Sequence, residues 1–178
     1  MKLAILDESG GAPLFGRVPS EQIAKHFFKV GLLNIIIAVA VTLPVLVPQL
    51  GLPLKLEVWP GTWMFVSYFV FLIVGVMGCF MWCFIYYMLP RVFEKNTVSE
   101  FLALSQLVSF EVAVVGICAL MGVDAGYYGG TLYHNGFGPV VVTQLIAWAV
   151  IPIGTLIVVA LLSTVTGVFN VVTATKEG

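Results

Sequence analysis

Long runs of apolar residues, separated by short polar segments, occupy most of the chain. A helix that crosses a lipid bilayer needs about 20 predominantly apolar residues, and four stretches reach that length. The pattern therefore predicts an all-α integral membrane protein, built as a bundle of four transmembrane helices within residues 28–178. The predicted spans cover residues 28–50, 63–89, 101–121 and 140–172.

The polar segments outside these spans also allow predictions of their structure. Residues 1–27 contain no apolar core of the kind that a signal peptide needs, so we expect a cytoplasmic N-terminal segment that is retained. Ser20 and Glu21 are typical of a helix start. They predict a short interfacial helix before the first span, or a helix that docks on a partner subunit. Residues 122–139 are rich in glycine and tyrosine, which favours an ordered outer loop with tight turns.

Lysine and arginine residues predict the orientation of the bundle. In membrane proteins, short cytoplasmic loops carry an excess of these residues. Only Lys55 falls on one side of the predicted spans. We therefore expect the other side, with both termini, to be cytoplasmic in a prokaryotic plasma membrane. That side carries Lys2, Arg17, Lys25, Lys29, Arg91, Lys95 and Lys176.

The composition excludes several classes of protein. The chain has 178 residues, of which 60% are hydrophobic and 10% charged, whereas soluble domains carry roughly 25% charged residues. We therefore expect no soluble domain of any size. The sequence has no basic stripe, which argues against nucleic acid as a partner. The three cysteines lie inside apolar runs and form no CxxC pair, so neither a disulfide framework nor a zinc site is indicated.

Glu111 lies near the middle of the third predicted span. An acidic residue at the centre of a spanning helix costs at least about 2.5–3.5 kcal/mol, so such a residue is a functional candidate by default. The same face of its own helix offers no polar neighbour. We therefore expect Glu111 to be protonated at neutral pH and to form a hydrogen bond with another helix.

Thr42 and Thr155 are the candidate partners at a similar depth on the first and fourth spans. Pro152 lies close to Thr155 and frees a backbone carbonyl one turn earlier, which predicts a kinked, locally polar position near Glu111. Two interpretations of Glu111 follow. One is a hydrogen bond that only holds helices together, worth about 0.6 kcal/mol on average. The other is a carboxyl group that handles protons or contacts a quinone.

Small residues form a row at four-residue spacing on the second span. Gly75, Cys79 and Cys83 share one face, and small residues spaced in this way let helices approach closely. Two cysteines without a third ligand on that helix make a poor metal site, so packing is the preferred interpretation. Asn34, on the first span, predicts another interhelical hydrogen bond or a contact with a partner subunit.

The two histidines argue against a cofactor held by this chain alone. His26 and His134 fall on opposite sides of the predicted membrane, so they cannot together ligate one haem or one copper ion. His134 is a weak metal candidate beside Asn135 and Asp124, but a hydrogen-bonded loop histidine is the commoner outcome. Lipid and quinone are the ligands that these residues leave open.

The second and third predicted helices carry a resemblance to a known family. Pro60–Phe65, a long aromatic helix that ends with Ile85–Pro90, and a short charged turn over Arg91–Glu100 resemble a helix pair of subunit-I-like proteins of haem-copper oxidases. The chain as a whole is similar to the small helical accessory subunits of archaeal-type respiratory terminal oxidases. The resemblance implies a non-catalytic subunit, because the histidines that hold haem and copper in the catalytic subunit are missing. It further implies that haem and copper are held by partner subunits.

Three functional hypotheses follow. The first is an accessory subunit of a membrane-bound respiratory oxidoreductase, with a terminal oxidase as the favoured complex, which supports assembly and a proton or quinone path through Glu111. The second is a small homodimeric proton-coupled transporter with Glu111 as its coupling site. The third is a membrane anchor of a redox enzyme that contacts quinone or lipid.

Overall fold

The computed structural model describes residues 16–47 and 59–175. Within this part of the chain, four helices are long and apolar enough to cross a membrane, which confirms the prediction of four long apolar helices. The predicted end of the first span and most of the segment that follows it lie outside the described residues. The first to fourth long helices run over Ser20–Leu43, Trp63–Val92, Glu100–His134 and Pro139–Val172.

Three of the long helices change their helical pitch along their length. The first long helix lies within α1 (Ser20–Val45). The second consists of α3 (Trp63–Val70), the π-helical η2 (Phe71–Met77) and α4 (Gly78–Val92). The third consists of α5 (Glu100–Cys118), the π-helical η3 (Ala119–Tyr128) and α6 (Gly129–His134). The fourth consists of α7 (Pro139–Ile146), the 3₁₀ turn η4 (Ala147–Ala149) and α8 (Val150–Val172).

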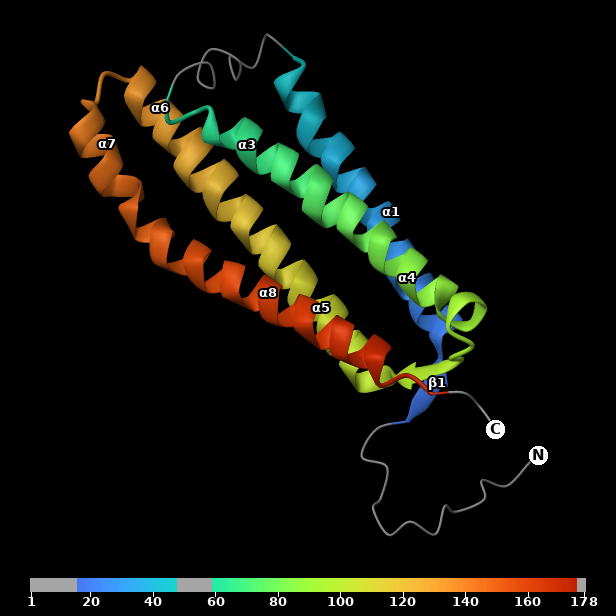
Figure 1. Ribbon diagram of the computed structural model, residues 1–178. Helices are drawn as coiled ribbons and strands as arrows, with labels where there is room; N and C mark the ends of the chain where they lie inside the picture. Colours follow the sequence, from blue (N-terminus) through green and yellow to red (C-terminus); the bar gives the residue numbers. More distant parts are fainter. Residues whose placement is uncertain (1–15, 48–58, 176–178) are drawn as a thin grey trace.

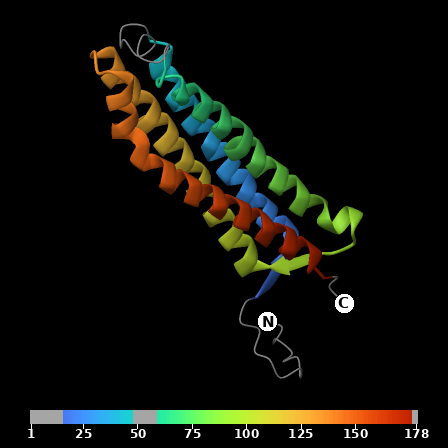
Figure 2. The same cartoon turned by 60° about the vertical axis from the view of Figure 1, so that its left-hand side comes forward.

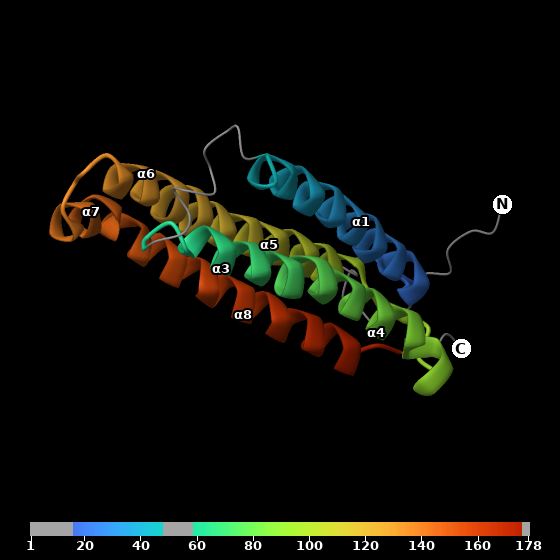
Figure 3. The same cartoon turned by 90° about the horizontal axis from the view of Figure 1, so that it is seen from above.

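The long helices pack mainly in chain order, each against the next (Figure 1). α1 contacts mainly α4 and η2, α3 contacts η3, and α5 contacts α8. Seen from above, α1 and α8 lie on opposite sides of the molecule (Figure 3). These two edge helices therefore carry broad exposed apolar faces, which include Ile36, Leu43, Ile151 and Leu161.

A small sheet joins three distant parts of the chain at one end of the bundle. β1 (Arg17–Pro19) pairs antiparallel with β2 (Thr97–Ser99), and Thr175 forms a further bridge to Thr97. We call this sheet and its bridge the clasp. It holds together the start of the first long helix, the turn before the third and the end of the fourth (Figure 2).

Aromatic rings fill the core next to the clasp. Phe27 of α1 lies against Tyr86 and Trp82 of α4, with ring centroids 5.6 and 6.5 Å apart. Phe27 and Tyr86 are fully buried. Because aromatic rings bury more apolar surface than most side chains, this contact anchors α1 to α4 close to the clasp.

α1 is one unbroken helix from Ser20, so the interfacial helix predicted before the first span is not a separate element. The sequence has no proline between Pro19 and Pro44, and nothing interrupts the backbone hydrogen bonds between them. Ile23 and Phe27 are buried in the core instead of lying on the surface of the bundle. The first turn therefore packs as part of the long helix.

The glycine- and tyrosine-rich stretch predicted as an outer loop is helical as far as His134. In this segment, glycine permits close contact between two helices, because it has no side chain. A Cβ at Gly126, for example, would lie only 2.6 Å from the backbone nitrogen of Met64. The turn itself is confined to residues 135–138, where Gly136 has a φ of +88°. The loop prediction is therefore wrong for most of this segment, because a glycine can mark either a turn or a contact.

The fourth long helix changes direction between α7 and α8 (Figure 1). The change lies at η4, three residues that end just before Val150. Pro152 has no N–H group, so the carbonyl of Trp148 lacks its usual helical partner. The kink predicted from Pro152 is present at this turn, but it does not lie near Glu111, because Gly116 already packs against Leu156 and the antiparallel helix carries Pro152 further away.

Gly126→Ala is expected to destabilise the protein, because the new Cβ would press on the backbone of Met64. Overpacking of this kind costs about 1–3 kcal/mol, so the Tm of the purified protein in detergent should fall. Gly154→Ala is the matched control, because nothing lies within 4 Å of a Cβ at that position. If both variants lose the same stability, Gly126 is not a packing contact.

Candidate functional site

Three polar side chains from three long helices meet about halfway along the bundle. Asn34 belongs to α1, Cys79 to α4 and Glu111 to α5. The Asn34 amide nitrogen lies 3.1 and 3.2 Å from the two carboxyl oxygens of Glu111. The Cys79 thiol donates to one of these oxygens at 2.8 Å. We call these three residues, with the backbone carbonyl of Gly75, the Glu111 cluster.

The Asn34 amide is the donor that connects the cluster. Its nitrogen also lies 3.1 Å from the Gly75 carbonyl oxygen and 3.8 Å from the Cys79 sulfur. Four acceptors therefore surround a group that has only two hydrogens. Asn34 is 1% exposed, so these acceptors compete for the same amide without help from solvent. Gly75 lies in the π-helical η2, a type of helix that is frequent at functional sites.

The side-chain donors around the Glu111 carboxyl carry no charge. One is an amide and the other is a thiol. An ion pair between Arg91 and Glu21, 3.7 Å apart, lies near the clasp and away from the cluster. Glu111 is partly exposed as a residue. A carboxyl group held by neutral donors, on a residue that is partly exposed, can take up a proton.

Thr42 and Thr155, the partners predicted for Glu111, form their hydrogen bonds elsewhere. The hydroxyl oxygens of Thr42 and Tyr68 lie 2.6 Å apart, between α1 and α3. Thr155 is exposed and donates to a carbonyl one turn earlier in α8. The interhelical hydrogen bond predicted for Asn34 is present, and it reaches Glu111 itself.

The predicted row of small residues divides between two roles. Gly75 and Cys79 belong to the Glu111 cluster, whereas Cys83 is partly buried against the hydrophobic core. His134 is exposed at the end of α6. Among the residues that the structure describes, no group of three or more His, Cys, Asp or Glu side chains could hold a metal ion.

A second polar cluster, which the sequence did not predict, lies closer to the clasp. The Tyr86 hydroxyl donates to Oε1 of Gln106 at 2.7 Å, and the Asn170 amide nitrogen lies 3.4 Å from the Tyr86 hydroxyl. Ser163 donates to the backbone carbonyl of Gln106 at 2.8 Å. We call these four residues the Gln106 cluster. Its signal in the sequence is Gln106 itself, because an amide inside an apolar helix also needs a partner.

The Gln106 cluster is tightly enclosed by the fourth long helix. Gln106 is 0% exposed, and a Cβ at Gly167 would overlap its side-chain amide. The amide nitrogen of Gln106 has no hydrogen-bond partner among the described residues. This close fit indicates a structural role, whereas the Glu111 cluster is the more open of the two.

Comparison with known proteins gave no match: no family model, no curated protein and no solved structure matches this chain. The candidate site is therefore defined by its own geometry. That geometry is the carboxyl group of a partly exposed residue, bonded to two other helices of an apolar bundle.

A double-mutant cycle should measure the bond between Asn34 and Glu111. Replacing each with alanine, singly and together, is expected to give a coupling free energy between the average of about 0.6 and the maximum of about 1.7 kcal/mol found for hydrogen bonds between membrane helices. The measurement is the free energy of unfolding in detergent. Thr155→Val combined with Glu111→Ala is the control pair and should be additive. Additive effects for Asn34 and Glu111 would mean that their contact contributes nothing.

Proposed function

We propose that this chain is an integral membrane protein and a non-catalytic accessory subunit of a membrane-bound respiratory oxidoreductase. A terminal oxidase is the complex that the sequence resemblance favours. In this proposal the partner subunits hold the haem and copper, and this chain supports their assembly. Both termini lie on the cytoplasmic side of a prokaryotic plasma membrane.

The distribution of basic residues supports this orientation. The Lys and Arg residues of the described chain all lie near the clasp, in β1, in the first half of α1, and in α4 and the turn after it. Short cytoplasmic segments carry such an excess. The clasp end is therefore the cytoplasmic end in this proposal. The residues concerned are Arg17, Lys25, Lys29, Arg91 and Lys95.

The observation that carries the proposal is the Glu111 cluster. Tyr86 and Gln106 are both fully buried, as expected of a purely structural contact. Glu111 instead is a partly exposed residue, and its carboxyl has only neutral side-chain donors around it. Intramembrane carboxyl groups of this kind mark proton relays and ligand contacts. In an oxidoreductase that takes up protons, Glu111 serves as one step of a proton path or contacts the quinone.

The edge helices support the role of a subunit. α1 and α8 expose apolar side chains along most of their length, and α8 packs mainly on α5 alone. In a membrane these faces contact lipid or the helices of partner subunits. In this proposal, both the haem and copper chemistry and the contacts of the edge helices therefore involve partner subunits.

A homodimeric proton-coupled transporter is the second candidate function. It is favoured by the same carboxyl together with the interrupted fourth helix at η4, because broken helices are common at transport sites. Here a second copy of the chain takes the place of the partner subunits. The two proposals differ in what accompanies the chain in native membranes.

The chain, tagged and purified from native membranes in mild detergent, is expected to bring haem- or copper-containing subunits with it. The measurement is the absorption spectrum of the preparation and the identity of the co-purified proteins. Untagged membranes treated in the same way provide the background. Recovery of the chain as a homodimer without metal-containing partners would support the transporter and count against the accessory subunit.

Glu111→Gln is expected to leave assembly intact and to slow proton-coupled turnover by at least severalfold. Glutamine keeps the size and much of the hydrogen bonding of glutamate, but it cannot release a proton. The readouts are the yield of the assembled complex and proton uptake per electron in reconstituted vesicles. Thr155→Val, on the exposed face of α8, is the control. Normal proton uptake by the Glu111→Gln complex would remove Glu111 from the path.

A further inference from the structure

Three of the five basic residues in the described part of the chain have partners within the fold. Arg17 and Lys95 each donate a hydrogen bond to the end of the fourth long helix or to the residues just after it. The guanidinium of Arg91 forms an ion pair with a carboxylate of α1, 3.7 Å away. Lys25 and Lys29 of α1 are exposed and have no partner among the described residues. Their two ammonium groups are therefore free to bind a ligand from outside the chain.

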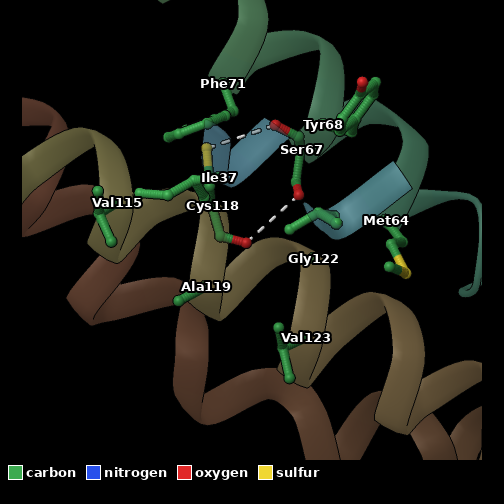
Figure 4. A pocket seen from close by; sticks show the side chains of 11 residues that line it. Ile37, Met64, Ser67, Tyr68, Phe71, Val115, Cys118, Ala119, Gly122 and Val123 are labelled. Atoms are coloured by element: carbon green, nitrogen blue, oxygen red, sulfur yellow. Dashed lines mark hydrogen bonds between the residues drawn. The ribbon is translucent and has the colours of Figure 1, made fainter. Parts of the chain in front are cut away.

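The two free lysines lie on the side of α1 that faces away from the bundle. Lys25 and Lys29 are four residues apart, so they are neighbours on one face of the helix, with Cβ atoms about 5–6 Å apart. The other side of α1 is packed. Phe27 and Asn34 are buried there, and Ile37 lines an apolar cavity between the first three long helices (Figure 4).

The helices around these lysines carry little negative charge. Glu21 is the one acidic residue of α1, and its carboxylate is already paired with Arg91. The second long helix, against which α1 mainly packs, has no acidic residue within Trp63–Val92. A ligand at Lys25 and Lys29 therefore meets positive charge that the neighbouring helices do not offset, which favours an anion.

An exposed apolar stripe continues from the lysines along the same face of α1. Leu32, Ile36 and Leu43 are all exposed. At about 100° per residue, these positions and the two lysines lie within about 60° of one another around the helix. From Lys29 to Leu43 the stripe is about 21 Å long, which is more than half of a bilayer core of about 30 Å. One acyl chain of a single leaflet can therefore lie along it.

We propose that this face of α1 binds an anionic phospholipid. Its phosphate lies between the ammonium groups of Lys25 and Lys29, and one acyl chain runs along the stripe over Leu32, Ile36 and Leu43. Lysine side chains extend along apolar surface and keep their charged ends in the polar layer, so both ammonium groups reach the same headgroup. The inference goes beyond the proposed function, because it requires only that α1 lies in a membrane, whatever complex the chain joins.

A lipid with a net negative charge fits this face better than a zwitterionic lipid. The headgroup of phosphatidylethanolamine carries an ammonium group beside its phosphate, and this group needs an acidic partner. Glu21, one turn before Lys25, is the nearest acid on this face, and it is already paired with Arg91. The headgroup of phosphatidylglycerol has no ammonium group, so both lysines attract it without opposition.

Native mass spectrometry of the purified chain in a non-ionic detergent tests the proposal. Dioleoyl phosphatidylglycerol and dioleoyl phosphatidylethanolamine share their acyl chains and are titrated separately, and the bound fraction gives each Kd. The wild type is expected to bind phosphatidylglycerol at least fivefold more tightly. Lys29→Gln should lower this preference, and the double variant Lys25→Gln/Lys29→Gln should abolish it. Equal Kd values of the wild type for the two lipids would overturn the proposal.

Lys95→Gln is the matched control, because it removes the same charge at the same end of the bundle. Lys95 already has a partner in the fold, so this variant should keep the preference for phosphatidylglycerol. The double variant Lys25→Arg/Lys29→Arg keeps both charges and should also retain it. Equal losses in Lys95→Gln and Lys29→Gln would mean that net charge alone attracts the lipid, and the site would be rejected.

Two further measurements do not depend on the glutamine variants. A high salt concentration should weaken the binding of phosphatidylglycerol to the wild type more than that of phosphatidylethanolamine, because salt screens the attraction between charges. Leu32→Ala/Ile36→Ala keeps the helix but removes apolar surface. It should weaken the binding of both lipids at least threefold and leave the preference unchanged. Wild-type binding of both lipids by this variant would place the acyl chain elsewhere and contradict the proposal.

An acidic segment of a partner protein is the competing ligand for the same lysines. In that case the isolated chain shows no preference for phosphatidylglycerol, and Lys25→Gln/Lys29→Gln instead lowers the yield of co-purified proteins from native membranes. That outcome would overturn the lipid site. A chain that prefers phosphatidylglycerol but co-purifies with no redox partner would leave the lipid site intact and count against the accessory subunit alone.

Discussion

Hydrogen bonds between polar side chains decide how the long helices of this protein face one another. Apolar contacts have little directional preference, and by themselves they would let neighbouring helices rotate or slide. A buried polar group left without a partner costs about 1–3 kcal/mol, which penalises any such displacement. The Glu111 cluster connects the first three long helices, and the Gln106 cluster connects the last three. Both clusters include residues of the second and third long helices, so together they connect all four long helices.

Because the four long helices pack side by side in chain order, the two inner helices have different surroundings from the two edge helices. The second and third long helices have neighbours on two sides, and both polar clusters are built on them. α1 and α8 have neighbours mainly on one side and expose apolar side chains on the other. A protein made in this way has two chemically similar edges. Each edge is suited to contact lipid or another helix, which is the arrangement that the proposed subunit role requires.

The sequence predicted the helices better than it predicted the contacts between them. The four long helices follow from the local density of apolar residues, which needs no knowledge of the fold. Asn34 and Glu111 were each identified as unusual in apolar surroundings, but their pairing depends on how α1 and α5 are rotated and how deep each lies. Thr42 was chosen by depth alone, and the structure turns it towards Tyr68.

Two further residues show where a single sequence is ambiguous. Gly126 was assigned to a loop because glycine is common in turns, but the same missing side chain also permits the close approach of Met64. Gln106 drew no prediction, because a single amide inside an apolar helix does not reveal which helix it will meet. Its face meets the fourth long helix, a contact that becomes visible only once the order of packing is known.

The position of the clasp at one end has a mechanical consequence. It ties the ends of three long helices into one sheet, and the aromatic contact of Phe27 with Tyr86 reinforces it close by. At the opposite end, α1 has no comparable tie to α3 beyond the bond between Thr42 and Tyr68 in the described part of the chain. In the described part of the chain, the ties between helices are therefore denser at the clasp than at the opposite end. Because local stability falls where ties between elements are fewer, local opening of the described helices is expected to begin at the end away from the clasp.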